Sequence, residues 1–287
     1  MAEFILMTED TCDFPPEYYA ENDIVVAKLA YSIDDEIYRE GDKTIKEFYD
    51  LIRQGKKSTT MALNAEDVKA AMEPYLEDGK DILYIAFSSG LSLTYQSALM
   101  ALDELKEKYP DRKIIVVDSL CASLGEGLLV HHVNVLRKKG ATIEEAAKWA
   151  EDNRLRVAHS FMADDLMHLH RGGRLPKSKA VIGTMLGVKP VMHVTNEGKL
   201  APVGKTRGKK QALGMLVDNL AKCAGKTEND FFTVSHADCR EDAEYVAQLM
   251  KERFGIEDYV IGYIGPVIGS HTGSGTVAVF LMAEGRE

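Results

Sequence analysis

Apolar residues in the first 150 positions form short runs separated by segments with helical patterns. The runs that we expect to be strands are rich in branched side chains and cover residues 4–7, 82–87 and 114–117. The segments that we expect to be helices cover residues 97–108, 126–139 and 142–153. The last of these begins with Thr142, followed three residues later by Glu145, which is the pattern of a capping box. This alternation predicts parallel strands joined by crossover helices.

The pattern changes near Arg154. Residues 191–195 and 199–203 are strand-like runs that flank Asn196-Glu197-Gly198, a turn sequence typical of a β-hairpin, so antiparallel pairing is expected here. The remaining expected elements are helices over residues 211–222 and 240–253, and strands over residues 231–235, 259–264 and 277–282.

Together these patterns predict an α/β protein with two domains. Residues 1–154 are expected to form an N-terminal α/β domain around a parallel sheet, and residues 155–287 a C-terminal α+β domain around a mixed or antiparallel sheet. No internal repeat or low-complexity linker separates the two halves. We therefore expect the domains to pack closely and to share a cleft.

A dense cluster of hydroxyl side chains follows the second expected strand. Ser88, Ser89, Ser92 and Thr94 lie in a loop between this strand and the start of a helix. Ligands usually bind at the carboxyl edge of parallel strands, and free backbone N–H groups at a helix start bind anions. A single N-cap requires only Ser92 or Thr94, so the number of hydroxyls favours a ligand site over capping alone.

Two further segments combine glycines with groups that can bind an anion. Residues 168–175 place Gly172 and Gly173 between two arginines, which suits either an approaching carboxylate or phosphate or the basic end of a helix. Residues 265–275 place four glycines around His271. A lone histidine is more often structural, but a loop so rich in glycine exposes backbone donors and favours a functional role.

Two polar clusters carry weaker signals. Ser58-Thr59-Thr60 precedes Asn64, a plausible N-cap, and by itself indicates a solvated loop. Lys205-Thr206-Arg207 is a basic cluster in an otherwise acidic chain, and most such runs are hydrated surface.

Composition narrows the class of protein. The chain has 287 residues, of which 45% are hydrophobic, which is ample for a buried core. With 35 basic and 45 acidic residues its formal charge is −10, which argues against a general nucleic-acid binder. The longest apolar run, residues 277–283, is far shorter than the roughly 20 residues that span a bilayer, so no integral membrane insertion is expected. The chain start lacks the features of an export signal, which predicts a cytoplasmic protein.

Cysteine and histidine positions do not indicate a metal or redox site. The four cysteines are widely scattered, and no pair has the two-residue spacing of a zinc or redox motif. His168 and His170 are the tightest histidine pair, but no ligand pattern surrounds them. No metal and no cofactor are therefore expected.

The ordered motifs resemble those of the DegV proteins, a family that includes the fatty-acid-binding subunits of bacterial fatty acid kinase. The resemblance spans nearly the whole chain. In order, the similar segments are residues 8–13, residues 88–98, Asp118-Ser119, residues 171–175, Lys189-Pro190 with the hairpin at residues 196–198, residues 205–207 and residues 269–273.

The chain departs from the family pattern at a few positions. Glu9 and Asp10 stand where the family usually has Asp and Ser, and Ser274 replaces a proline. Leu93 replaces a glycine after Ser92. A side chain at this position is expected to alter the angles of the loop and the tilt of the Ser92 hydroxyl, and so either the acyl specificity or the class of ligand.

The resemblance implies a long-chain fatty acid that lies in a tunnel between the two domains. The carboxylate would be bound by the hydroxyls of Thr60 and Ser92, with Arg174 and His271 at the headgroup. The surrounding headgroup loop would include Ser88, Ser89, Gly90 and Thr94. Candidate wall residues for the acyl chain are Phe161, Met162, Leu166, Met185, Leu186 and Ile268.

The resemblance also implies a partner. A fatty acid kinase catalytic subunit would contact Arg207 and Lys205 and phosphorylate the bound acid to an acyl phosphate, a phospholipid precursor. The protein itself would then be a non-catalytic lipid carrier whose only small molecule is the bound fatty acid.

Two other functions remain open at this level. In an acyl hydrolase, Ser92 would be the nucleophile and His271 the base, although the loop lacks a Gly-x-Ser-x-Gly elbow and no acid can be assigned to orient the histidine. In a binder of a phosphorylated metabolite, the glycine-rich loops would hold the phosphate, although neither a Walker sequence nor a dinucleotide fingerprint is present.

Overall fold

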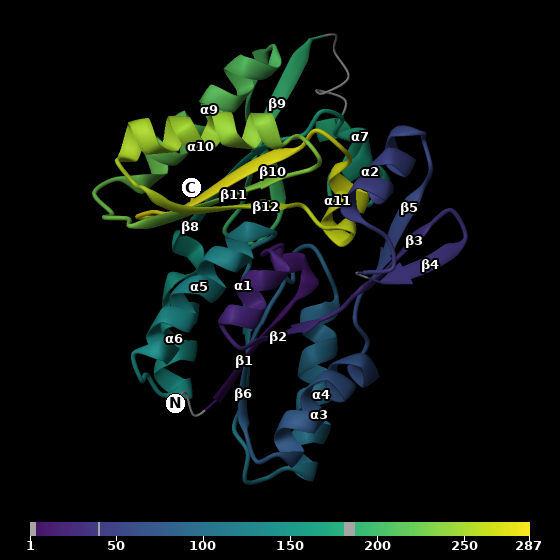
Figure 1. Cartoon of the computed structure of the whole chain (residues 1–287), viewed down its shortest axis with the longest axis vertical. Helices are drawn as coiled ribbons and strands as arrows, with labels where there is room; N and C mark the ends of the chain where they lie inside the picture. Colours follow the sequence, from purple (N-terminus) through teal and green to yellow (C-terminus); the bar gives the residue numbers. More distant parts are fainter. Residues whose placement is uncertain (1–3, 40, 181–186) are drawn as a thin grey trace.

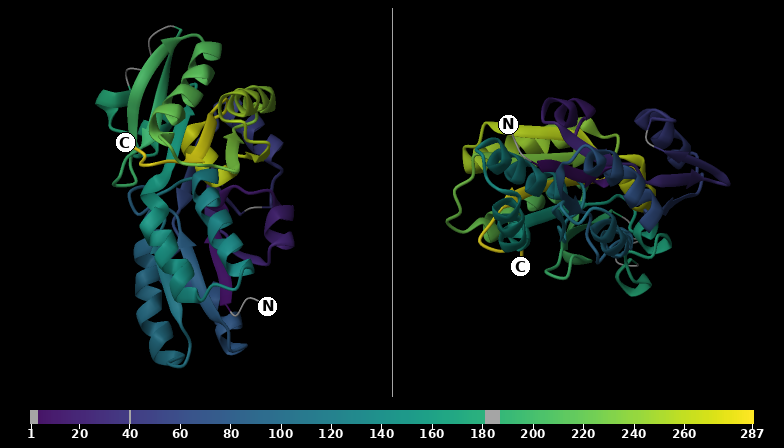
Figure 2. Two further views of the ribbon diagram at one scale, coloured as in Figure 1. Left: turned by 90° about the vertical axis from the view of Figure 1, so that its left-hand side faces the viewer. Right: turned by 90° about the horizontal axis from the view of Figure 1, so that it is seen from below.

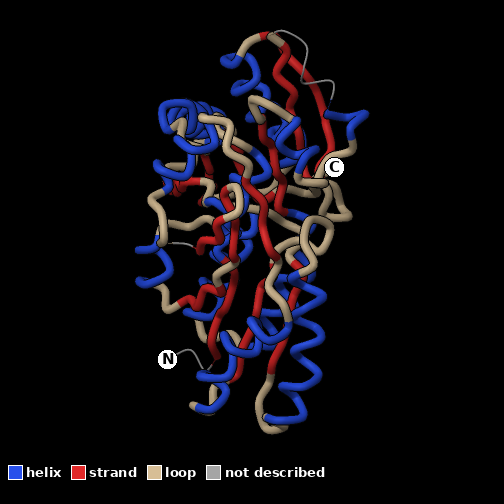
Figure 3. Tube along the Cα trace, turned by 90° about the vertical axis from the view of Figure 1, so that its right-hand side faces the viewer, coloured by secondary structure: helices blue, strands red, loops and turns tan. Residues whose placement is uncertain are grey.

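The computed structural model describes residues 4–39, 41–180 and 187–287. It contains a parallel sheet and a larger mixed sheet, which lie one beyond the other along the long axis of the molecule (Figure 1). In a side view the strands run through the middle of both halves, with helices on the outside (Figure 3). The predicted fold class is confirmed.

The parallel sheet is built from the first half of the sequence. Its strand order is β2-β1-β6-β7. The strands are β1 (Phe4–Glu9), β2 (Ile24–Ala27), β6 (Asp81–Ala86) and β7 (Ile114–Asp118). One face packs against α3 (Ala65–Glu77) and α4 (Thr94–Lys108), and the other against α5 (Leu124–Lys138) and α6 (Ile143–Asn153). Thr142 and Glu145 form the predicted capping box of α6.

The mixed sheet is built from the second half of the sequence. Its order is β10-β9-β8-β13-β11-β12, in which only the β11–β12 pair is parallel. The strands are β8 (Val157–Met162), β9 (Val188–Val194), β10 (Leu200–Arg207), β11 (Phe231–His236), β12 (Asp258–Tyr263) and β13 (Val277–Met282). Helices α9 (Lys209–Ala224) and α10 (Arg240–Phe254) cover its outer face, and α5 contacts its inner face (Figure 2). The hairpin predicted at residues 196–198 joins β9 to β10.

Several short elements connect these layers. They are η1 (Asp10–Cys12), α1 (Pro16–Glu21), η2 (Arg154–Arg156), α7 (Met167–Arg171) and α8 (Lys177–Ala180). Within the described part of the chain, no helix is both long and apolar enough to cross a bilayer.

A third, antiparallel sheet was not predicted. It has the order β4-β3-β5 and consists of β3 (Ala30–Ile33), β4 (Glu36–Arg39) and β5 (Ser58–Met61), with α2 (Ile45–Arg53) packed on it. The prediction of a solvated loop at residues 58–60 was therefore wrong. The first three β5 side chains are polar, and the only apolar one, Met61, is exposed, so no apolar pattern marked this strand.

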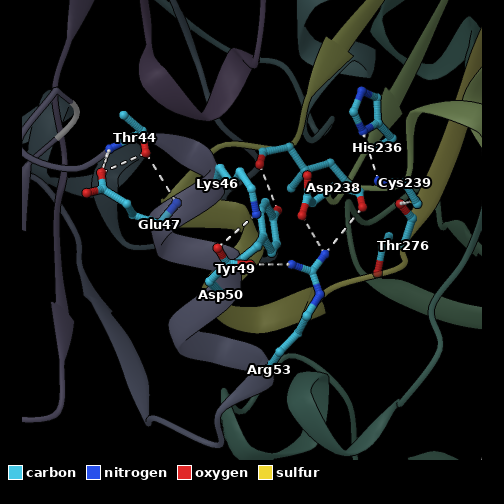
Figure 4. A network of polar contacts seen from close by, with 11 residues as sticks. Thr44, Lys46, Glu47, Tyr49, Asp50, Arg53, His236, Asp238, Cys239 and Thr276 are labelled. Atoms are coloured by element: carbon cyan, nitrogen blue, oxygen red, sulfur yellow. Dashed lines mark hydrogen bonds and ion pairs between the residues drawn. The ribbon is translucent and has the colours of Figure 1, made fainter.

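This third sheet comes from the N-terminal half of the sequence but packs against an element near the C-terminus, α11 (Pro266–Thr272) (Figure 1). The Tyr49 hydroxyl donates a hydrogen bond of 2.7 Å to the Ile264 carbonyl. Arg53 forms a 2.5 Å ion pair with Asp238 (Figure 4). These contacts hold β5 beside α11.

Helix α11 also corrects a prediction, because residues 265–275 were expected to form a loop. The one glycine within this helix, Gly269, permits close packing. A Cβ at Gly269 would lie only 2.6 Å from the Tyr49 hydroxyl, so a larger residue there would push α2 away.

Candidate functional site

A largely apolar cavity lies between the parallel and mixed sheets. The space among its lining atoms is about 800 Å³, a figure that includes the open end. Strands of the mixed sheet, the segments that follow β1, β2, β6 and β7 of the parallel sheet, and the β5–α11 region all contribute to its wall. The apolar wall residues are Leu29, Ala62, Phe87, Leu91, Ala122, Phe161, Leu169, Val194, Leu200, Ile264, Val267, Ile268, Ala278 and Phe280.

The wall residues expected from the sequence have different positions. Phe161 and Ile268 line the cavity. Met162 is buried on the side of the mixed sheet that faces α9 and α10. Leu166 is buried in the apolar core that also contains residues of α5 and α6. Neither belongs to the cavity wall. Met185 and Leu186 lie outside the described residues.

The cavity is also lined by polar side chains, and these include all four expected to bind a carboxylate: Thr60, Ser92, Arg174 and His271. The other polar lining residues are Thr11, Ser123, His159, Thr272 and Thr276. Alternation along β5 turns Ser58 and Thr60 inward, toward α11. Thr60 Oγ1 lies 2.7 Å from Nε2 of His271. This hydrogen bond joins two elements of the site, β5 and α11, across 211 positions of the sequence.

Arg174 is held in place by backbone carbonyls. Its Nε donates to the Leu91 carbonyl at 2.9 Å, and Nη1 donates to the Gly172 carbonyl. Since half of this side chain is withdrawn from water, its guanidinium is a positive charge in a poorly solvated position. It lies beside His271 and faces the polar part of the cavity.

His271 is uncharged at neutral pH. Burial, together with the neighbouring positive charge of Arg174, lowers the pKa of His271 to about 4. Its Nδ1 atom is buried and has no hydrogen-bond partner among the described residues. Nδ1 also lies against Gly172, where a Cβ would come within 2.1 Å of it. The imidazole is thus held by its hydrogen bond to Thr60, and it packs so closely on Gly172 that no side chain would fit there.

Ser92 is placed by the start of α4. Its hydroxyl accepts a 3.2 Å hydrogen bond from the Thr94 N–H and lies 3.1 Å from the Thr94 hydroxyl. Leu93 does not strain this loop, because its φ of −87° is ordinary for any residue and its side chain is 70% exposed. The leucine therefore points to solvent and does not enter the cavity.

The other residues of the expected headgroup loop do not line the cavity. Ser88 is buried and donates a 2.8 Å hydrogen bond to the Gly198 carbonyl in the β9–β10 hairpin. The Ser89 N–H donates to Asp118 at 3.1 Å, and the Thr94 hydroxyl accepts from the Leu63 N–H at 3.2 Å. Gly90 lies against the same hairpin. These residues fasten the loop to its surroundings.

Lys205 and Arg207 lie away from the cavity. Both are exposed on β10, the edge strand of the mixed sheet, and they lie two residues apart, so their side chains share one face. This position leaves both accessible to another protein.

Sequence reasoning missed a buried acidic cluster behind the cavity wall. Glu126 accepts hydrogen bonds from Thr8 at 2.8 Å and Thr11 at 3.1 Å. Glu9 accepts from the Tyr84 hydroxyl at 2.7 Å and from the Phe87 N–H at 3.0 Å.

Burial is the main reason why both carboxyl groups are hard to ionise. It raises the pKa of Glu9 to about 7, and it raises the pKa of Glu126 well above its usual range. The only sequence signal was an acid at position 126 within an apolar helix.

Ser92 and His271 are not arranged as the nucleophile and base of a hydrolase among the described residues. No hydrogen bond joins Ser92 to His271 in the described structure; His271 Nε2 is paired with Thr60 instead. No carboxylate orients its Nδ1 atom among the residues described. Across the described ranges, no group of three or more histidine, cysteine and acidic side chains is arranged to hold a metal ion.

Comparison with known proteins places this architecture among proteins of one family. The sequence model of the DegV family of uncharacterised proteins matches residues 3–284. A DegV domain-containing protein of Clostridium perfringens is 40% identical over 290 residues, which cover 100% of both chains.

Solved structures agree. A DegV family protein from Thermus thermophilus, described as fatty-acid binding, is 28% identical, with a TM-score of 0.89 over 98% of this chain and 99% of that one. DegV from Bacillus subtilis, described as a fatty acid binding protein, is 28% identical, with a TM-score of 0.85 over 99% of this chain and 100% of that one. The protein belongs to the DegV family.

Proposed function

We propose that this protein binds a long-chain fatty acid in the cavity and presents its carboxylate to a fatty acid kinase catalytic subunit. The observation that carries the proposal is an apolar cavity whose polar lining brings Thr60, Ser92, Arg174 and His271 together. The fatty-acid-binding relatives from Thermus thermophilus and Bacillus subtilis, which share the fold over nearly the whole chain, support it.

The apolar wall suits an acyl chain. Each buried CH₂ contributes about 0.8 kcal/mol, so a chain of some 16 carbons contributes roughly 12 kcal/mol before the costs of ordering it. This term alone favours retention of the ligand without any covalent bond.

The polar end suits a carboxylate. A buried carboxylate is costly unless several donors satisfy it. The hydroxyls of Thr60 and Ser92 supply two hydrogen bonds, and the Arg174 guanidinium supplies a nearby positive charge. Neutral His271 can share its proton with Thr60, which leaves the Thr60 O–H free to donate to the ligand.

In this proposal the chemistry belongs to the partner. One carboxylate oxygen attacks the terminal phosphorus of a nucleoside triphosphate, the bond from that phosphorus to its bridging oxygen breaks, and a nucleoside diphosphate leaves. The residues of this chain hold the attacking oxygen in place and keep the acyl chain out of water. Because the phosphoryl donor is a nucleoside triphosphate, the proposal places the protein in the cytoplasm.

Arg207 and Lys205 are proposed to contact the kinase subunit. An exposed arginine at a sheet edge can pair with a carboxylate of another protein through two hydrogen bonds. We expect Arg207→Ala to lower the rate of fatty acid phosphorylation by about tenfold and to leave fatty acid binding unchanged.

The test is a phosphorylation assay with a DegV-associated kinase subunit, using delipidated protein reloaded with hexadecanoic acid. Arg253→Ala, which removes an exposed arginine from α10, serves as the matched control. A normal rate with Arg207→Ala would remove the partner contact, whereas failure of the wild type to bind hexadecanoic acid would overturn the proposed function.

A further inference from the structure

A second cleft lies on the outer side of the Thr60–His271 pair. Thr60, Arg174 and His271 line both this cleft and the apolar cavity, so the three side chains form the partition between them. Most of the remaining wall comes from the β5 end of the third sheet and from α7. An atom attached to the outer oxygen of a carboxylate at this partition would enter the cleft and not the apolar cavity.

The cleft is basic in a chain whose net charge is −10. Lys56, Lys57 and Arg171 line it together with Arg174, and no acidic side chain belongs to the described lining. His168 adds an imidazole. Four cations gathered on one concave surface make it a local attractor for anions.

Nearby acids only partly neutralise these cations. Lys56 is paired with Asp34 at 2.8 Å, outside the cleft lining. Arg171 is 4.0 Å from Asp165, which is the outer limit for an ion pair. Among the described residues, no carboxylate lies within ion-pairing distance of the Lys57 ammonium group. Lys57 and Arg171 therefore retain most of their ability to bind an anion.

Hydroxyl groups complete the surface. Ser58 and Ser270 lie 2.6 Å apart through their hydroxyl oxygens and line the cleft with Thr59. Lysine, arginine and hydroxyl side chains around one concave surface match the several oxygens of a phosphoryl group.

We infer that this outer cleft binds the phosphoryl group of an acyl phosphate, with Lys57 and Arg171 as its principal phosphate contacts. The inference rests on the proposed function, because it places the acyl chain in the apolar cavity and the reacting carboxylate at the partition. A fatty acid has no phosphoryl group, so it makes little use of the cleft. The cleft thus distinguishes the two ligands by the phosphoryl group alone.

The experiment compares two ligands that share an acyl-length chain. Hexadecyl phosphate is a stable probe for the phosphorylated ligand, and hexadecanoic acid represents the unphosphorylated one. Both are titrated into delipidated wild-type protein and the Lys57→Ala/Arg171→Ala double variant. The control is Lys222→Ala/Arg253→Ala, which removes the same charges from exposed positions of α9 and α10.

We expect the cleft variant to lose at least about tenfold in affinity for hexadecyl phosphate and less than about twofold for hexadecanoic acid, with unchanged melting temperature. The control variant is expected to bind both ligands like the wild type. Equal losses for the two ligands, or no loss for either, would overturn the assignment of the cleft.

Titration with inorganic phosphate separates the two sources of a phosphoryl group. If the double variant loses phosphate binding but keeps its affinity for hexadecyl phosphate, the cleft binds free phosphate and the inference is wrong. If the wild type binds neither hexadecyl phosphate nor hexadecanoic acid, the proposed function itself fails. If the wild type binds hexadecanoic acid normally but the double variant loses no more affinity for hexadecyl phosphate than for hexadecanoic acid, the phosphoryl site is wrong and the proposed function stands.

Discussion

Two polar clusters adjoin the apolar cavity, and they are built in opposite ways. In the inner cluster, the oxygens of Glu126 accept hydrogen bonds from Thr8 and Thr11, and only Thr11 lines the cavity. In the outer cluster, formed by Thr60, Ser92, Arg174 and His271, every member lines the cavity.

The difference separates a structural polar cluster from a ligand site. The hydroxyls of the inner cluster are used by the protein's own carboxyl groups, which burial keeps from ionising readily. The outer cluster offers its hydroxyls and the Arg174 charge to the cavity. Changes in the inner cluster should therefore alter stability, and changes in the outer cluster should alter ligand binding.

The largest effect is expected from Glu126→Ala. The change leaves the Thr8 and Thr11 hydroxyls without their acceptor and opens a small void, and together these cost about 4 kcal/mol in the free energy of unfolding. Urea denaturation measures the loss, and Glu126→Gln, which keeps an acceptor oxygen, is the milder control. The folded variant should still bind its fatty acid. Loss of fatty acid binding without loss of stability would contradict the structural role of the inner cluster.

The second effect is expected from the double variant Thr60→Val/Ser92→Ala. Removing two hydroxyls that bind a carboxylate should weaken fatty acid binding by about 3 kcal/mol, or roughly 100-fold, with little change in stability. Calorimetric titration with hexadecanoic acid gives the affinity. Ser89→Ala is the matched control, because Ser89 belongs to the same loop but does not line the cavity. Equal affinities of the double variant and this control would contradict the carboxylate site.

A smaller effect is expected from Gly172→Ala. The added Cβ would lie 2.1 Å from His271 Nδ1, so the imidazole must move and weaken its bond to Thr60. Fatty acid affinity should fall about tenfold, the equivalent of one lost hydrogen bond. Gly214→Ala is the control because a Cβ there meets no atom within 4 Å. Tight binding by Gly172→Ala would show that the imidazole position is unimportant.

The last prediction concerns the dependence of stability on pH. The pKa of Glu9 is raised from 4.5 to about 7 in the folded protein, so its stabilising contribution is complete below pH 4.5 and is lost as pH rises toward 7. Buried histidines such as His271, whose pKa is lowered to about 4, contribute the opposite slope.

Comparison with Glu9→Gln therefore isolates the contribution of this carboxyl group. The stability of the wild type relative to Glu9→Gln should decline between pH 4.5 and 7, as measured by urea denaturation at several pH values. A constant difference between the two proteins would show that Glu9 does not titrate in this range.

The sequence predicted most strands of the two large sheets because these strands are compact apolar runs; β2, of only four residues, was not predicted. It did not predict the third sheet, since β5 is a polar segment whose burial depends on α11, more than 200 residues away. Helix α11 was mistaken for a loop because glycine normally disfavours helix, whereas Gly269 within it leaves room for Tyr49. Both elements depend on long-range packing that local patterns do not record.

In the candidate site, too, local patterns identified a segment but not the contacts that its residues make over long distances in the sequence. Hydroxyl density drew attention to residues 88–94, but it did not distinguish Ser92, which lines the cavity, from Ser88, which bonds to the Gly198 carbonyl. The two partners of that bond are 110 residues apart. The proximity of Thr60 and His271 entered the sequence analysis only through the family resemblance, for the same reason.

Mass spectrometry of the ligand that accompanies the purified protein tests the central claim most directly. The wild type and the Thr60→Val/Ser92→Ala variant are purified without added lipid and denatured, and their organic extracts are quantified against protein. The account predicts a near-stoichiometric long-chain fatty acid from the wild type and much less from the variant. A wild-type extract free of fatty acid, from protein that also fails to bind added hexadecanoic acid, would contradict it.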